Sequence, residues 1–78
     1  MTTVREHVDA ARALLVSAGL EHQEAAVDAE VLARNALGWD RATYLADGRA
    51  EAPGNFPNRY RSLLERRVKR EPVSLITG

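Results

Sequence analysis

The sequence is that of one small domain, with 78 residues, 45% hydrophobic side chains and 28% charged side chains. A chain of this length buries about 60% of its unfolded surface, so it can hold one modest core. It has no cysteine and no apolar run near the ~20 residues that cross a bilayer, which excludes a disulfide framework, a thiolate metal site and a membrane partner. The N-terminus does not resemble a signal peptide, and we expect a cytoplasmic protein.

The formal net charge of zero hides an asymmetry between the two halves of the chain. Residues 1–40 carry three basic and seven acidic side chains, whereas residues 41–78 carry eight basic and four acidic side chains. Two interpretations follow. The halves attract each other within one fold, or the basic half offers a face to a negatively charged or polar partner.

A first helix is predicted from Val4 to Ala18. Thr3 and Glu6 form a capping-box pattern before it, and Gly19 is a suitable stop after it. Apolar residues recur at helical spacing on one face: Val4, Val8, Ala11, Leu15 and Ala18.

A second helix is predicted from Gln23 to Leu37, ending at Gly38. Its apolar residues do not form one stripe, because Val27 and Val31 point away from the face that holds its alanines and Leu32. A helix that is apolar on two sides is usually central, with neighbours on both.

The third predicted helix is short, from Arg41 to Ala46, with Asp40 as its N-cap. The fourth runs from Pro57 to Arg70 and ends before Pro72, since the residue that precedes a proline is biased away from helical geometry. Trp39 and Tyr44 are expected to anchor the core or its rim.

The last residues, Val73–Gly78, are apolar and rich in β-branched side chains, which predicts an extended and poorly held segment. The expected fold is therefore all-α: a small antiparallel bundle of four to five helices over residues 1–72, followed by residues 73–78 as the start of a linker.

The sequence shows no nucleophile–base set, no Gly-rich phosphate loop and no paired-histidine metal motif, so we expect no catalytic, cofactor-binding or metal site. One charged residue on an apolar face does need a partner. Arg67 projects into the apolar side of the fourth helix, and we expect it to pair with Asp28 or Glu30 of the second helix.

A basic stripe is predicted on the opposite face of the fourth helix. Arg59, Arg66 and Arg70 share this face, with Lys69 at its edge. The stripe is either a solvated charged surface or a docking surface for a partner. Aromatic residues that could stack on bases do not interleave with it, so this pattern does not favour nucleic-acid binding.

Several blocks of the sequence, in their order and spacing, resemble the N-terminal domain of the HemK/PrmC family of peptide-chain-release-factor glutamine N5-methyltransferases. The resemblance covers essentially the whole chain. Its most specific part is the ending, in which Arg66 and Arg67 precede Glu71–Val73 and Thr77–Gly78. The other blocks are Asp28–Leu32, Leu37–Gly38 with Arg41, and Leu63–Arg67.

The resemblance implies a parent enzyme with a separate catalytic domain that binds S-adenosylmethionine and methylates the glutamine of the Gly-Gly-Gln motif in release factors. No catalytic residue carries over, because the chain lacks the Asn-Pro-Pro-Tyr motif of that domain. What carries over is recognition of the release factor, with Arg59, Arg66, Lys69 and Arg70 as candidate contacts. There are two alternatives. The chain is a free-standing helical module for interaction or nucleic-acid binding, or it is only a scaffold for the catalytic domain.

Overall fold

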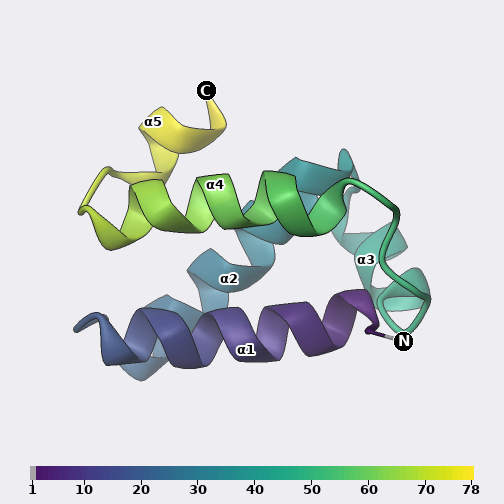
Figure 1. Cartoon of the computed structure of the whole chain (residues 1–78), viewed down its shortest axis with the longest axis horizontal. Coiled ribbons are helices and arrows are strands. Elements are labelled where there is room, and N and C mark those ends of the chain that lie inside the picture. Colours follow the sequence, from purple (N-terminus) through teal and green to yellow (C-terminus); the bar gives the residue numbers. More distant parts are fainter. Residues whose placement is uncertain (1) are drawn as a thin grey trace.

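Five helices make up the computed structural model, which describes residues 2–78 (Figure 1). They are α1 (Val4–Ser17), α2 (His22–Leu37), α3 (Arg41–Asp47), α4 (Phe56–Val68) and α5 (Val73–Thr77). The predicted all-α fold is confirmed, and the bounds of the first three helices agree with the predicted ones to within one residue. The fourth helix ends two residues earlier than expected, and a fifth helix replaces the expected extended segment.

The N-terminus of α1 is held by its own side chains and by a distant loop. Thr3 and Glu6 form the predicted capping box, with Thr3 N donating to Glu6 Oε1 over 2.8 Å and Glu6 N donating to Thr3 Oγ1 over 3.1 Å. The hydrogen bond from the Thr3 backbone lowers the pKa of Glu6. Two further amides of the first turn, those of Val4 and Arg5, donate to carbonyls of the loop between α3 and α4.

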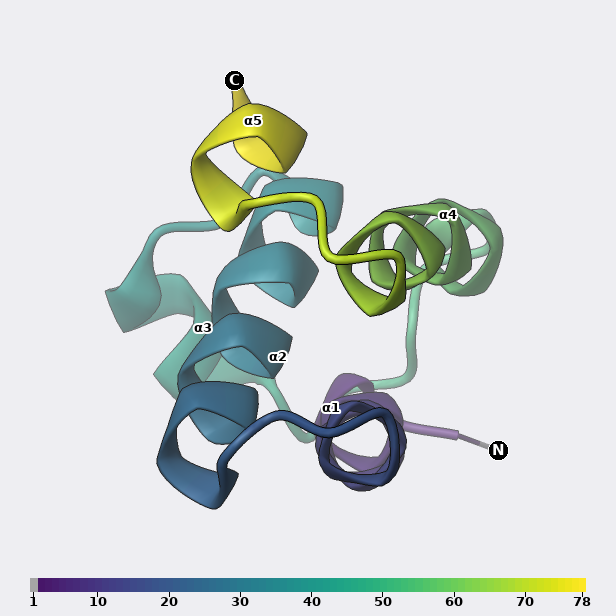
Figure 2. The same ribbon diagram turned by 90° about the vertical axis from the view of Figure 1, so that its left-hand side faces the viewer.

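The helices α1 and α4 lie side by side and run in the same direction, and α2 crosses behind them (Figures 1 and 2). The helix α3 lies near the N-terminal ends of α1 and α4, while α5 folds back over α2 and α4. The helix α2 therefore contacts α1, α4 and α5 and is the central element.

Alanines on α2 allow this close packing. Ala25, Ala29 and Ala33 are completely buried, and their small side chains let the neighbouring helices approach. The expectation that α2 is covered on two opposite sides is wrong for Val27, whose side chain is 50% exposed, because the neighbouring helices cover the alanine side. Val31 is only partly buried.

Aromatic side chains of α4 connect it to both α1 and α2. Phe56 and Tyr60 stack with their ring centroids 5.0 Å apart, and the ring of His7 meets Phe56 edge-on at 5.4 Å. The buried Tyr60 hydroxyl donates a hydrogen bond of 2.7 Å to the carbonyl of Ala29 on α2. Desolvation raises the pKa of this phenol, so it stays protonated and keeps the hydrogen bond.

The short helix α3 begins at the predicted N-cap. Asp40 Oδ1 accepts a hydrogen bond of 2.8 Å from Thr43 N, which lowers the pKa of this carboxyl. Tyr44 is buried and its ring lies under the guanidinium of Arg5, 5.7 Å from ring centroid to guanidinium carbon. Trp39 is partly buried against the core. Both aromatic residues thus have the structural place that the sequence suggested.

The helices α1, α2 and α4 each end beside a residue with a left-handed backbone. At Gly19 and Gly38 the chain takes the left-handed φ that a side chain disfavours, with φ of 107° and 70°. Arg70 takes the same conformation after α4, with φ of 74°, although it is not glycine. The Arg70 amide donates a hydrogen bond to the carbonyl of Arg67, and the Glu71 amide donates one to the carbonyl of Arg66. This turn ends α4 at Val68, earlier than the proline rule predicted.

The segment after Pro72 is helical, so the prediction of an extended and poorly held segment is wrong. The amides of Leu75 and Ile76 donate to the carbonyl of Pro72, and Thr77 Oγ1 donates to Val73 O over 3.1 Å. Ile76 is 6% exposed and packs with the core, and α5 contacts both α2 and α4. Burial of this side chain outweighs the β preference of the local sequence.

Candidate functional site

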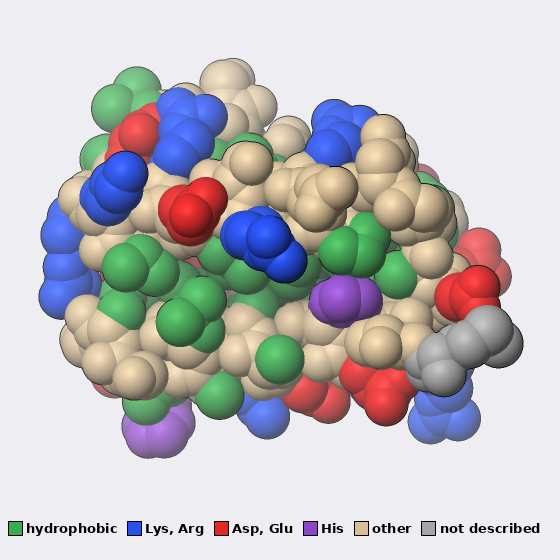
Figure 3. Space-filling model, in the orientation of Figure 1, with side chains coloured by type: hydrophobic (Ala, Val, Ile, Leu, Met, Phe, Trp, Pro, Cys, Tyr) green, Lys and Arg blue, Asp and Glu red, His purple; other side chains and the backbone are tan. Residues whose placement is uncertain are grey.

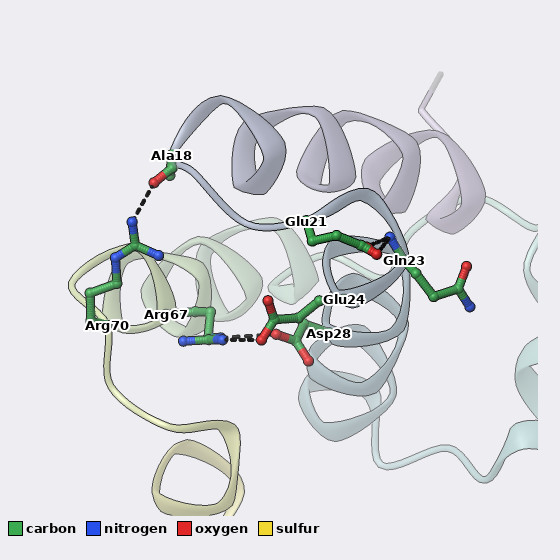
Figure 4. Close-up of polar contacts among 7 residues, drawn as sticks. All are labelled: Ala18, Glu21, Gln23, Glu24, Asp28, Arg67 and Arg70. Atoms are coloured by element: carbon green, nitrogen blue, oxygen red, sulfur yellow. Dashed lines mark hydrogen bonds and ion pairs between the residues drawn. The ribbon is translucent and has the colours of Figure 1, made fainter.

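Arg67 on α4 is bound by two carboxylates of α2. Its Nε lies 2.9 Å from Asp28 Oδ2 and its Nη2 lies 3.2 Å from Glu24 Oε2 (Figure 4). The side chains of Arg67 and Asp28 are each 13% exposed, so both charges are largely removed from water. The structure thus brings Arg67 to Asp28, one of the two partners that the sequence suggested. Glu24, one helical turn earlier on α2, is a partner that sequence reasoning missed.

The other suggested partner, Glu30, lies elsewhere. Its carboxylate pairs with Arg41 at 3.0 Å and with Arg34 at 3.6 Å, so it ties α2 to the start of α3. Residues 28 and 30 point to different sides of the helix, because successive residues are rotated by about 100°. The attraction between an acidic first half and a basic second half is visible in both clusters.

Two residues of the predicted basic stripe are engaged within the fold. Arg66 forms an ion pair with Glu71 and a weak hydrogen bond of 3.4 Å to Leu75 O. The hydrogen bond between the side chains of Arg66 and Glu71 raises the pKa of the Arg66 guanidinium and lowers the pKa of the Glu71 carboxyl. Arg70 donates to Ala18 O over 2.9 Å (Figure 4). Both guanidinium groups therefore hold helix ends together in the isolated chain.

The other two members of the stripe remain available. Arg59 and Lys69 are exposed, and within residues 2–78 neither has an ion-pair partner. The stripe is therefore not uniform: two of its cations stabilise the bundle and two face solvent.

An apolar groove of about 450 Å³ lies between α1 and α4, on the face away from α2. In Figure 3 apolar side chains form a band along this face, with charged side chains above it. We call this feature the α1–α4 groove. Its apolar lining is Ala10, Ala11, Leu14, Pro57, Tyr60, Leu64 and Val68, and its polar lining is His7, Arg61, Glu65 and Lys69.

Sequence reasoning missed this groove. Leu14 is adjacent to the predicted stripe of α1 but not on it, and its side chain is 48% exposed. A leucine next to the predicted apolar face of the first helix was the signal that could have indicated a wider apolar surface.

Among residues 2–78, no group of three or more His, Cys, Asp and Glu side chains could hold a metal ion. No helix in the same part of the chain has the length and apolar composition to cross a membrane.

The fold and this surface define a small all-α bundle domain. A family model described as the PrmC N-terminal domain matches residues 6–78, nearly the whole chain. The chain therefore belongs to the PrmC N-terminal domain family, the helical domain of PrmC/HemK methyltransferases. No curated protein and no solved structure is significantly similar to it.

Proposed function

We propose that this chain is the recognition domain of a methyltransferase that modifies the glutamine of the Gly-Gly-Gln motif in peptide chain release factors. The observation that carries the proposal is the family match over residues 6–78. The domain binds and positions the release factor, and a separate catalytic domain performs the methyl transfer. Release factors act in translation, which fits the expected cytoplasmic location.

The methyl donor of the proposed reaction is S-adenosylmethionine, and the residues of this chain do not fit a site for it. Rossmann-like domains bind nucleotide-containing cofactors at a Gly-rich turn between a strand and a helix. The secondary-structure elements of residues 2–78 are all helices, and the five glycines are scattered along the sequence. The proposed role of this chain is therefore confined to the protein substrate.

The polar part of the recognition surface is the exposed side of α4. Arg59 and Lys69 carry charges that nothing within residues 2–78 neutralises, so they can attract and orient an acidic surface. Arg66 and Arg70, the other two candidates, would have to exchange internal partners for external ones. We therefore assign the first contact to Arg59 and Lys69.

The test is methylation of a release factor by the methyltransferase that carries this domain. The double variant R59E/K69E should raise KM for the release factor about tenfold, with kcat and the KM for S-adenosylmethionine unchanged. The matched control is R12E/R49E, which makes the same charge change at two exposed arginines of α1 and the α3–α4 loop.

Two results would contradict the proposal. An unchanged KM in R59E/K69E would remove these residues from the contact. Normal methylation by an enzyme from which the whole domain has been deleted would leave the domain only a scaffolding role.

A further inference from the structure

We infer that the α1–α4 groove is the docking site for one amphipathic helix of the protein substrate, with an apolar stripe flanked by an acid–base–acid series at four-residue spacing. The identity of the partner as a release factor rests on the proposed function. The form and the charge pattern of the docking element rest on the geometry of the groove.

The shape of the groove suits a helix. The helices α1 and α4 run side by side in one direction, and α2 crosses behind both of them (Figures 1 and 2). The groove between α1 and α4 is lined by these two helices alone, and its lining is mainly apolar. A helix laid there would bury Leu14, which is 48% exposed, together with the outer edges of Leu64 and Val68.

The length of the groove sets the length of the partner. The charged edge on α4 runs from Arg61 to Lys69, a distance of about 12 Å at 1.5 Å per residue. On α1 the lining extends from His7 to Leu14, about 10 Å. At 5.4 Å per turn, a partner helix of slightly more than two turns would cover both sides.

The charges on the edge of the groove define its complement. Arg61, Glu65 and Lys69 follow one another at four-residue spacing and alternate in sign. Opposite charges at this spacing can pair along a helix, yet none of the three has an ion-pair partner within residues 2–78. Arg66 and Arg67, on other faces of α4, are both paired. The charges beside the groove are therefore free for an external series of acid, base and acid.

The same charges disfavour a second copy of this chain as the occupant. In a two-fold interface centred on this edge, Glu65 would face its own equivalent and Arg61 would face the partner's Lys69. Both contacts bring like charges together, which costs free energy. A complementary helix avoids this and, since the series is symmetric, it can bind in either direction.

The first experiment uses designed peptides as probes. A fluorescein-labelled, alanine-based helix of about 18 residues carries a leucine stripe flanked by Glu–Lys–Glu at four-residue spacing, and a second peptide carries Lys–Glu–Lys. Fluorescence anisotropy should show about tenfold tighter binding of the first peptide to the protein. Equal affinity for the two peptides, or no binding of either, would overturn the proposal.

Two variants locate the binding. L14D should weaken binding of the Glu–Lys–Glu peptide at least tenfold, whereas L45D, at a leucine that is 56% exposed on α3, should not change it. The exchange R61E/E65R/K69E should invert the preference between the peptides. The control is R12E, outside the groove, which lowers the net charge by the same amount and should leave the preference between the peptides unchanged.

The second experiment separates this inference from the proposed function. In the full methyltransferase, L14D should raise KM for the release factor at least tenfold, with kcat unchanged and with L45D as the control.

If the release factor is methylated by L14D with an unchanged KM, the groove is not the docking site and the proposed function stands. If the release factor is not a substrate at all, the proposed function fails and the peptide preference alone decides whether the groove takes a helix. A dimer through the groove, detected by sedimentation and abolished by L14D, would also overturn the inference.

Discussion

The guanidinium of Arg70 donates a hydrogen bond to the backbone carbonyl of Ala18, 2.9 Å away, from a residue whose own backbone is left-handed. Ala18 is the C-cap of α1, and Arg70 lies just after the C-cap of α4. The bond therefore satisfies an end carbonyl of one helix with the terminating residue of another. Space is tight at this point, because a Cβ atom built on Gly19 would lie 2.8 Å from Arg70 Nη2.

Substitution of Arg70 should separate backbone strain from the hydrogen bond. R70A and R70G both lose the bond to Ala18, but glycine removes the cost of a left-handed backbone. We expect R70G to be more stable than R70A by about 1 kcal/mol in urea unfolding. Equal stabilities of the two variants would show that the backbone at this position is not strained.

Loss of Arg67 should destabilise the bundle because it leaves the buried Asp28 carboxylate without its partner. We expect R67M to lower the free energy of unfolding by about 2 kcal/mol, and R67M/D28L to recover part of this loss, since the unpaired charge is then gone. E24Q should cost less than about 1 kcal/mol, because Glu24 is 53% exposed. A double variant less stable than R67M would contradict this account.

Removal of the Tyr60 hydroxyl should cost about 1 kcal/mol, since its hydrogen bond to Ala29 is buried. The variant should also change the response to alkali. Burial raises the pKa of Tyr60 above the usual 10.0, so the folded state holds its proton more tightly than the unfolded state. This contribution to stability is present below pH 10.0 and declines as pH rises above it.

Urea unfolding at a series of alkaline pH values checks this prediction. The free energy of unfolding of the unmodified protein should fall more steeply above pH 10.0 than that of Y60F. Some dependence should remain in Y60F, because desolvation also raises the pKa of Tyr44. Parallel curves for the two proteins would contradict the prediction.

Ile76 tests whether α5 belongs to the folded domain. I76A removes a side chain that is 6% exposed and should lower the free energy of unfolding by about 2–4 kcal/mol. Its matched control is L75A, next to it, whose side chain is 65% exposed and should contribute little. Equal and small effects of both substitutions would mean that residues 73–77 are not held against α2 and α4.

The sequence predicted those features that depend on local signals. The capping box of Thr3 and Glu6 and the glycines at positions 19 and 38 mark helix ends wherever they occur, and α1 and α2 were found almost to the residue. Arg67 was also predictable in part, because a charge on an apolar face requires a partner and Asp28 was on the facing helix.

The missed features depend on contacts between distant segments. Nothing local indicates that Arg70 replaces glycine after α4, since the compensating group is Ala18 O, which lies 52 residues earlier. Likewise Val73–Thr77 is helical because Ile76 finds a place in the core, not because of its own residue preferences. The basic stripe was inferred from spacing alone, which cannot show that Arg66 and Arg70 already have internal partners.

The first turn of α1 is hydrogen-bonded to the loop between α3 and α4. Amides in the first turn of a helix normally face water, but Val4 N and Arg5 N donate to Ala50 O and Gly48 O, 3.2 Å and 2.8 Å away. These bonds join residues more than forty positions apart and require that the loop after α3 lies against the start of α1. Hydrogen exchange at Val4 and Arg5 should therefore report on opening of the domain as a whole rather than on fraying of one helix end.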